Sequence, residues 1–277
     1  MTLMSVAAKT VGCLGIVLKY TDRSSCLRLP PSVPSHFVRS HFQCSTRHYY
    51  HYISGSQDTR QQARQTTITS TMSNSSTLLA NQKFDFFLIL DFEATCDNRQ
   101  QLIPQEIIEF PVLKFNARTQ TVDSVYHHYV LPQYHPQLTP FCTELTGIVQ
   151  DMVNDQPELL HILQSFDEWM LTENLLNSQV KSVFVTCGDW DLKTMLPKQC
   201  TVLNVGHKNY FHKWINIKKS FADVTGTFPK GMMDMLTHLG LKHVGRVHSG
   251  IDDCYNISNI LKALLQKGYI FKENGRL

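Results

Sequence analysis

Residues 84–277 are predicted to fold as an α/β domain, a mixed β-sheet flanked by helices, and three observations support this. The first is a strand, FDFFLILDF at Phe84–Phe92, with apolar side chains on both of its faces, as is typical of the centre of an α/β sheet. The second is a pair of further strand patterns directly after it. The third is a run of helical patterns interrupted by one more apolar strand.

Two acids end the first predicted strand. Its even-numbered side chains, from Phe84 onward, lie on one face, and Phe87 and Ile89 lie on the other. Asp91 and Glu93 continue the Phe87 face. Because carboxylates are seldom buried without a partner, this pair suggests a shared cation. Taken alone, the pair is explained equally well by a strand that emerges into solvent.

Two more strands follow, joined by a hairpin. Glu106–Asn116 is predicted to be the second strand, and Pro111 within it indicates an irregularity or a sheet edge. Thr121–Pro132 is predicted to be the third, and the hairpin connection begins at Asn116–Ala117. Three successive strands, the first apolar on both faces, indicate the start of a mixed sheet.

The second half of the domain combines helices with one strand. Pro157–Asn174 has apolar residues at helical spacing and a proline in its first turn, and Lys181–Asp191 is a short apolar strand that ends in acids. The other predicted helices are Thr143–Ile148, stopped by Gly147, and Asp191–Cys200, Lys230–Leu241 and Ile251–Lys267. This β-β-β-α-β-α order with a C-terminal helix is the ribonuclease H-like arrangement, and no stretch is predicted to span a membrane.

The net charge of +3 hides an asymmetry between the two parts of the chain. Residues 1–83 carry nine Lys/Arg and two Asp/Glu, a balance of +7, whereas residues 84–277 carry seventeen Lys/Arg and twenty-one Asp/Glu, a balance of −4. An acidic domain is a poor passive binder of polyanions. If this domain handles nucleic acid, bound metal ions must offset part of its charge.

Residues 1–83 are predicted to be a disordered, basic, Ser/Thr-rich leader and linker, with the folded domain at 84–277. The first acid is Asp22, and the basic and hydroxyl-rich composition is typical of a mitochondrial transit peptide. A disordered leader with no address fits equally well. The eight cysteines form no CxxC pair, which indicates reduced thiols in an intracellular protein. We therefore expect the cytoplasm or the nucleus, or mitochondrial import through the leader.

Acids also recur at two later places. Asp189 and Asp191 end the fourth predicted strand, and since they share one parity, periodicity does not separate them. In the last predicted helix, Asp253 lies on the apolar stripe that must face the sheet. Asp252 is expected to point toward solvent together with Asn256 and Asn259.

The candidate set is therefore Asp91, Glu93, Asp253, one aspartate of the fourth strand, and His248 in the loop before the last helix. Hard oxygen ligands without clustered Cys or His suit Mg²⁺ or Mn²⁺. Two such ions, about 4 Å apart, can clamp the attacking and leaving oxygens of a phosphodiester displacement. A histidine suits the role of general base, because an imidazole titrates near neutral pH.

Three motifs in order give a resemblance to a known family. DFEAT, GDWD and H-x4-D resemble the motifs of the DEDDh 3′–5′ exonucleases. DFEATCD, PQEIIEFPV, FCTELTGI and HSGIDDC-x-NI are similar to segments of the ERI exoribonuclease family, nearest to its third member, over about residues 84–272. That member's description as a prion-protein-interacting exonuclease implies prion protein as a partner.

The resemblance implies roles for particular residues. Asp91, Glu93, Asp191 and Asp253 match the metal-binding acids, which selects Asp191 over its neighbour in the same strand. Catalytic roles follow for Glu93 and for His248, the matched general base. Two positions, Glu93 and Ala94, match residues that touch the terminal nucleotide, and His248 also lies at the substrate.

The expected function is a metal-dependent 3′–5′ exoribonuclease in RNA processing. It would release nucleoside 5′-monophosphates from single-stranded RNA 3′ ends, with two Mg²⁺ or Mn²⁺ ions and His248 as base. Trp190 and Phe141 are candidates for stacking on the terminal bases, with plain core packing as the alternative. The alternative functions are a DNA 3′ exonuclease of the same superfamily and a non-catalytic RNA- or protein-binding module. The complete set of acids argues against the last.

Overall fold

The computed structural model describes residues 82–277 of the chain. The leader and linker predicted for the preceding segment lie outside those residues. In the described part, no helix combines the length and the apolar character needed to cross a bilayer.

A seven-stranded mixed sheet forms the centre of the domain. Its strands are β1 Phe86–Leu90, β2 Glu93–Ala94, β3 Ile107–Asn116, β4 Thr121–Tyr129, β5 Ser182–Thr186, β6 Lys213–Asn216 and β7 Gly275–Arg276. β3 pairs antiparallel with β4 along one side and with β1 and the short β2 along the other. β1, β5 and β6 are parallel neighbours, and β7 closes the far edge antiparallel to β6.

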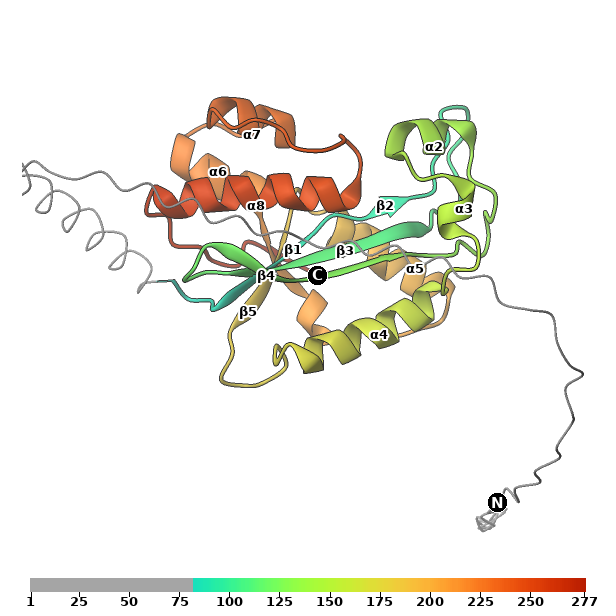
Figure 1. Cartoon of the computed structure of the whole chain (residues 1–277), viewed down its shortest axis with the longest axis horizontal. Coiled ribbons are helices and arrows are strands. Elements are labelled where there is room, and N and C mark those ends of the chain that lie inside the picture. Colours follow the sequence, from blue (N-terminus) through green and yellow to red (C-terminus); the bar gives the residue numbers. More distant parts are fainter. Residues whose placement is uncertain (1–81) are drawn as a thin grey trace, which may run out of the picture. The chain divides into compact units, whose positions relative to one another are not determined.

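Helices cover both faces of this sheet, as the sequence predicts. The helices are α2 Pro140–Thr146, α3 Gln150–Val153, α4 Leu159–Thr172, α5 Leu196–Val202, α6 Ile217–Thr225, α7 Met232–His238 and α8 Gly250–Gln266. A π-helical turn, Asp191–Met195, precedes α5, and a 3₁₀ turn, Asn209–Phe211, precedes β6. In Figure 1, α6, α7 and α8 lie on one face of the sheet and α4 lies on the other.

The alternation of β1 divides the core into two halves. Leu88 and Leu90 pack with α4 and α5, whereas Phe87 and Ile89 pack with α6, α7 and α8. Phe84 departs from the predicted face, because it packs on the α8 side with its ring 6.0 Å from that of Phe87. The strand begins only at residue 86, so the strict alternation does not extend back to Phe84.

Pro111 lies in an inner strand, so the edge interpretation of this proline is wrong and the irregularity is confirmed. β3 has neighbours on both sides, and Pro111 pairs with His127 of β4. Across its other side the ladder runs from Leu90, opposite Val112, to Glu93, opposite Glu109. Pro111 therefore faces the interruption between β1 and β2, where a missing N–H costs no regular ladder bond.

The sequence patterns miss β6 and α6. The signal for α6 lies in its two ends: Asn216 accepts a hydrogen bond from the Lys218 N–H at 3.1 Å, and Gly226 ends the helix at φ 75°. An Asn N-cap followed by a glycine at this distance indicates a helix of this length. In α4, Pro157 lies before the N-cap Glu158 and not in the first turn, contrary to the prediction.

We expect Gly250→Ala to destabilise the domain. Gly250 starts α8, and a Cβ there would lie 2.7 Å from the Asp91 carbonyl oxygen and 3.1 Å from Glu109 Oε2. Overpacking of this kind costs about 1–3 kcal/mol. Thermal unfolding measures it, with Gly206→Ala as the control because nothing lies within 4 Å of that Cβ. Equal melting temperatures in the two variants would contradict the close packing of α8 on β1.

Candidate functional site

The predicted site residues come together where β1 and β5 end. Asp91 directly follows β1, Glu93 lies in β2, and Asp191 is the first residue of the π-helical turn after β5. Asp253 lies in the first turn of α8, and His248 lies two residues before that helix. Carboxyl ends of neighbouring parallel strands meet at one sheet edge, which is why residues so distant in sequence share one place.

Asp91 lies at the centre of the acids. Burial raises its pKa well above the ordinary value, and the negative charges of Asp191, Glu93, Asp253 and Glu109 raise it further. Each of these carboxylates is thus close enough to disfavour a charge on Asp91. Without bound cations, these neighbouring carboxylates cannot all be ionised without a cost in free energy.

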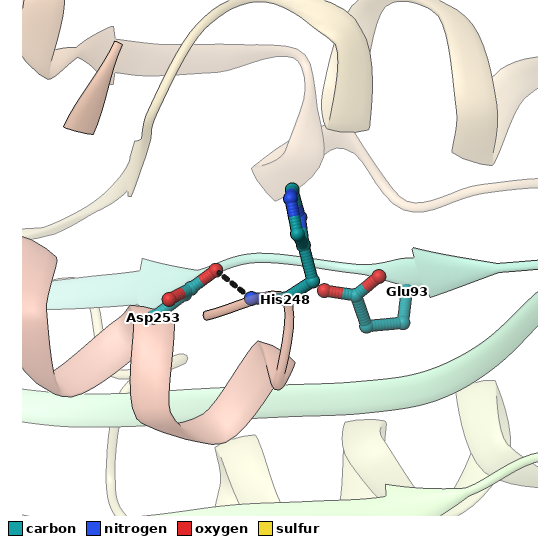
Figure 2. A group of neighbouring side chains, drawn as sticks. All are labelled: Glu93, His248 and Asp253. Carbon is teal, nitrogen blue, oxygen red and sulfur yellow. Dashed lines mark hydrogen bonds between the residues drawn. The ribbon is translucent and has the colours of Figure 1, made fainter. Parts of the chain in front are cut away.

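Glu93, His248 and Asp253 form the tightest group. One ligand atom from each lies within 4.8 Å of the others, and Figure 2 shows the carboxylates of Glu93 from β2 and Asp253 from α8 on either side of His248. Burial first, and then neighbouring acids, raise the pKa of Glu93 to about 9. The backbone N–H of His248, at φ 60°, donates to Asp253 Oδ2 at 3.2 Å. This left-handed conformation is uncommon outside glycine and directs the exposed imidazole outward at the mouth of the site.

The structure separates Asp191 from Asp189, which the sequence pattern does not. Buried Asp191 accepts a hydrogen bond from the Phe92 N–H at 3.0 Å, and burial raises its pKa to about 6. Asp189 instead accepts from Trp214 Nε1 at 2.9 Å and from Lys219 Nζ at 3.1 Å. The prediction that the strand runs to Asp191 is wrong, because β5 ends at residue 186 and the chain turns at Gly188.

Asp253 points inward, as the helical geometry predicts, and is 5% exposed. The prediction that Asn256 points to solvent is wrong: it is fully buried, accepts from the Val244 N–H at 2.9 Å and donates to the Val244 carbonyl at 2.8 Å. Asp252 accepts from the Arg246 N–H at 2.8 Å. The segment 242–248 therefore covers this side of α8 and holds His248 beside it.

One buried acid near the site, Glu109, is not predicted from the sequence. Glu109, in β3 opposite Glu93, is 1% exposed and accepts hydrogen bonds from the backbone of Gly250 and Ile251 and from His127. A signal for it exists, because a carboxylate in the middle of an apolar strand needs a partner. The pattern does not say that the partner is the first turn of α8.

A pocket of about 600 Å³ opens over the acids, lined by Asp91, His248 and Asp253 and by Lys230 on the α7 side. The predicted stacking residues do not line it. Trp190, 40% exposed, lines another pocket of about 600 Å³ together with Ile103. Two other predicted substrate contacts are less exposed: Phe141 is half-buried in α2, and Ala94 is buried. Their contact with a nucleotide stays a prediction.

The acids fit a hard divalent cation. Asp253 Oδ1 is buried and has no hydrogen-bond partner within residues 82–277, and the nearest base, His243 Nε2, is 3.7 Å away. A buried carboxylate oxygen without a donor is costly unless a cation binds it. Oxygen ligands on several elements around a common point are the donor set of Mg²⁺-type ions.

Comparison with known proteins agrees with this geometry. The RNase_T family model, described as exonuclease, matches residues 88–261. ERI1 exoribonuclease 3 of Homo sapiens is 57% identical over 196 residues, which cover 70% of this chain and 58% of that relative's length. The chain thus spans little more than half of this curated relative.

Two solved structures are also similar. The nuclease domain of 3′hExo, a DEDDh family member, bound to rAMP, has a TM-score of 0.68 and 33% identity, and the match covers 71% of this chain and 100% of that one. A structure on 3′-end specific recognition of histone mRNA stem-loop by 3′-exonuclease has a TM-score of 0.69 and 31% identity, over 77% of this chain and 74% of that one.

These matches confirm the ribonuclease H-like fold and the resemblance drawn from the DFEAT, GDWD and H-x4-D motifs. DEDDh exonucleases depend on divalent metal ions, in agreement with the cluster of acids described above. The chain therefore belongs to the RNase_T exonuclease family, within its ERI branch of DEDDh enzymes.

Proposed function

We propose that this protein is a divalent-metal-dependent 3′–5′ exoribonuclease that releases nucleoside 5′-monophosphates from single-stranded RNA. The observation that carries the proposal is the convergence of Asp91, Glu93, Asp191 and Asp253 beside His248. RNA is favoured over DNA because one similar nuclease domain was solved with rAMP and another similar structure concerns a histone mRNA stem-loop.

The four carboxylates would hold two Mg²⁺ or Mn²⁺ ions. When bound, these ions supply Lewis-acid stabilisation of the charge that develops on the phosphate oxygens. His248, exposed at the mouth of the pocket, would take the proton of the attacking water. A carboxylate oxygen of Glu93 lies within 4.8 Å of a ring nitrogen of His248. By its resemblance to the ERI family, Glu93 would contact the terminal nucleotide as well as a cation.

The test uses the full chain with end-labelled single-stranded RNA and DNA of the same sequence, in Mg²⁺ or in EDTA. We expect shortening from the 3′ end only with metal, faster on RNA, with nucleoside 5′-monophosphates as the products. Equal or faster loss from DNA would favour the deoxyribonuclease alternative. Binding of RNA without shortening, with metal present, would contradict the proposal and favour a non-catalytic module.

Two neighbouring aspartates offer a matched pair of variants. We expect Asp191→Asn to lower kcat by about 10²-fold or more, because a buried ligand loses its charge. Asp189→Asn should keep kcat and cost about 1 kcal/mol of stability, since within residues 82–277 its carboxylate accepts hydrogen bonds from Trp214, Asn216 and Lys219 alone. Steady-state kinetics and thermal unfolding measure both. The reverse pattern would place the metal on Asp189.

Stacking by Trp190 is tested with two variants. Trp190→Ala should raise KM, because a base stacked on an aromatic ring gains about 1–3 kcal/mol. Trp190→Phe retains a ring and should stay close to the parent. If both variants bind short RNA as the parent does, Trp190 only lines its pocket. The same comparison with Phe141→Ala and Phe141→Tyr, which retains a ring, tests the second candidate.

Partner and location are also proposals. Prion protein as a partner rests on the resemblance to the third ERI member, and co-purification of the two full-length proteins tests it. An intracellular location rests on the cysteine pattern. Fusing residues 1–60 to a fluorescent reporter distinguishes mitochondrial import from the cytoplasm or nucleus.

A further inference from the structure

We infer that Glu109 is a positioning residue of the proposed exonuclease: it holds the first turn of α8 against the sheet and thereby places Asp253 and His248. The inference rests on the proposed function for its kinetic consequence. Its structural basis is independent of that function.

Glu109 supplies the N-terminal cap that α8 lacks within its own sequence. Ser249, at the N-cap position, makes no side-chain capping hydrogen bond. Glu109 Oε2 instead accepts from the Gly250 N–H at 2.9 Å, and its Oε1 accepts from the Ile251 N–H at 3.2 Å. A carboxylate at a helix N-terminus also interacts favourably with the helix dipole. Glu109, a strand residue remote in sequence, thus caps the N-terminus of α8.

The capped turn is the one that carries the chemistry. The Asp253 N–H donates to the Ser249 carbonyl at 2.8 Å in that turn, and Asp253 Oδ2 accepts from the His248 N–H. At Gly250 the helix packs closely on the residue that follows β1, because even a Cβ on this glycine would lie 2.7 Å from the Asp91 carbonyl oxygen. A shift of the helix start would therefore move Asp253 and His248 relative to Asp91.

Glu109 is fully engaged in this role. Its Oε1 lies 2.8 Å from Nε2 of His127, a half-buried residue of β4, so both carboxylate oxygens have protein partners. The acid is 1% exposed and does not line the pocket that Asp91, His248 and Asp253 share. It is thus a support for the site and not one of its ligands.

Glu106 is a natural control for Glu109. This acid precedes β3, is fully buried, and accepts hydrogen bonds from the backbone N–H groups of Gln133, Tyr134 and His135. The hydrogen bonds of its carboxylate go to that loop and none goes to α8. Loss of either acid removes a buried carboxylate that accepts backbone hydrogen bonds, and loss of Glu109 alone releases the helix start.

The experiment compares Glu109→Gln with Glu106→Gln in the full chain. An amide keeps the size of the side chain but places an NH₂ group against one of the two backbone donors. We expect Glu109→Gln to lower kcat by about 10–100-fold and to weaken Mn²⁺ binding, with KM changed by less than about threefold. Glu106→Gln should lower the melting temperature without these changes. Mn²⁺ binding is measured by titration without RNA.

Three results would overturn the inference. One is parental kcat and Mn²⁺ affinity in a folded Glu109→Gln variant. Another is an equal fall of kcat in Glu106→Gln, and the third is complete loss of Mn²⁺ binding, which would make Glu109 a ligand. If Glu109→Gln does not fold, Glu109→Asp tests the same point. Its shorter side chain keeps the charge but moves the carboxylate away from the start of α8, so we expect a smaller fall of kcat. An inactive parent would refute the proposed function, while the Mn²⁺ titration would still test the positioning.

Discussion

Replacing Asp91 by asparagine is expected to abolish RNA shortening and, at the same time, to stabilise the metal-free domain. Activity should fall by about 10²–10³-fold or more, because a central ligand for the cation loses its charge. Stability should rise because half-buried Asp91 lies close to Asp191, Glu93, Asp253 and Glu109, all of which disfavour its ionised form. Exonuclease assays and thermal unfolding in EDTA measure the two effects on one preparation.

The opposite signs of these two effects make the variant informative. A residue that only supports the fold would lose both activity and stability when replaced. Asp123→Asn is the control, since this exposed aspartate lies in β4 level with the start of β1, at the opposite end of that strand from Asp91, and neither quantity should change. An Asp91→Asn variant that melts lower than the parent in EDTA would contradict the crowding of like charges. Retained activity would contradict the metal assignment.

The metal-free domain is expected to lose stability as pH rises, and divalent metal should restore it. The pKa of Glu93 is raised by burial and neighbouring acids from 4.5 to about 9, and those of Asp91, Asp191 and Asp253 are raised as well. The folded state then binds more protons than the unfolded state between about pH 4.5 and pH 9. Stability must fall with rising pH across that window.

Thermal unfolding in EDTA from pH 5 to pH 9 measures this slope. Glu93→Gln should flatten it, because one of the raised groups is removed. Saturating Mg²⁺ or Mn²⁺ should oppose it, since the ligands bind the ion deprotonated, and metal at about 100 times its Kd adds about 2.7 kcal/mol. A pH profile that is the same with and without metal would mean that the acids do not bind the ion.

Much of the site could be predicted from the sequence because its first and last parts follow simple periodicities. Asp91 and Glu93 end a strand whose two faces are both apolar, and the structure places both acids on the α8 side with Phe87. Asp253 lies on the buried stripe of α8, as its helical phase requires. Here local geometry alone decides which way the side chain points.

The parts that could not be predicted depend on contacts between distant segments. Asp189 and Asp191 share one parity in the sequence, and only the turn at Gly188 and the hydrogen bonds of Asp189 to β6 separate them. Asn256 has the phase of an exposed residue but is buried under segment 242–248, which has no periodic pattern. Glu109 receives its role from a helix more than a hundred residues later in the chain.

The location of Mn²⁺ in crystals of the protein, found by anomalous scattering, tests most directly whether the four acids form one metal centre. We expect peaks bounded by the carboxylates of Asp91, Glu93, Asp191 and Asp253, next to the His248 imidazole. Peaks elsewhere, or carboxylates that point apart with no peak among them in Mn²⁺-soaked crystals, would contradict it.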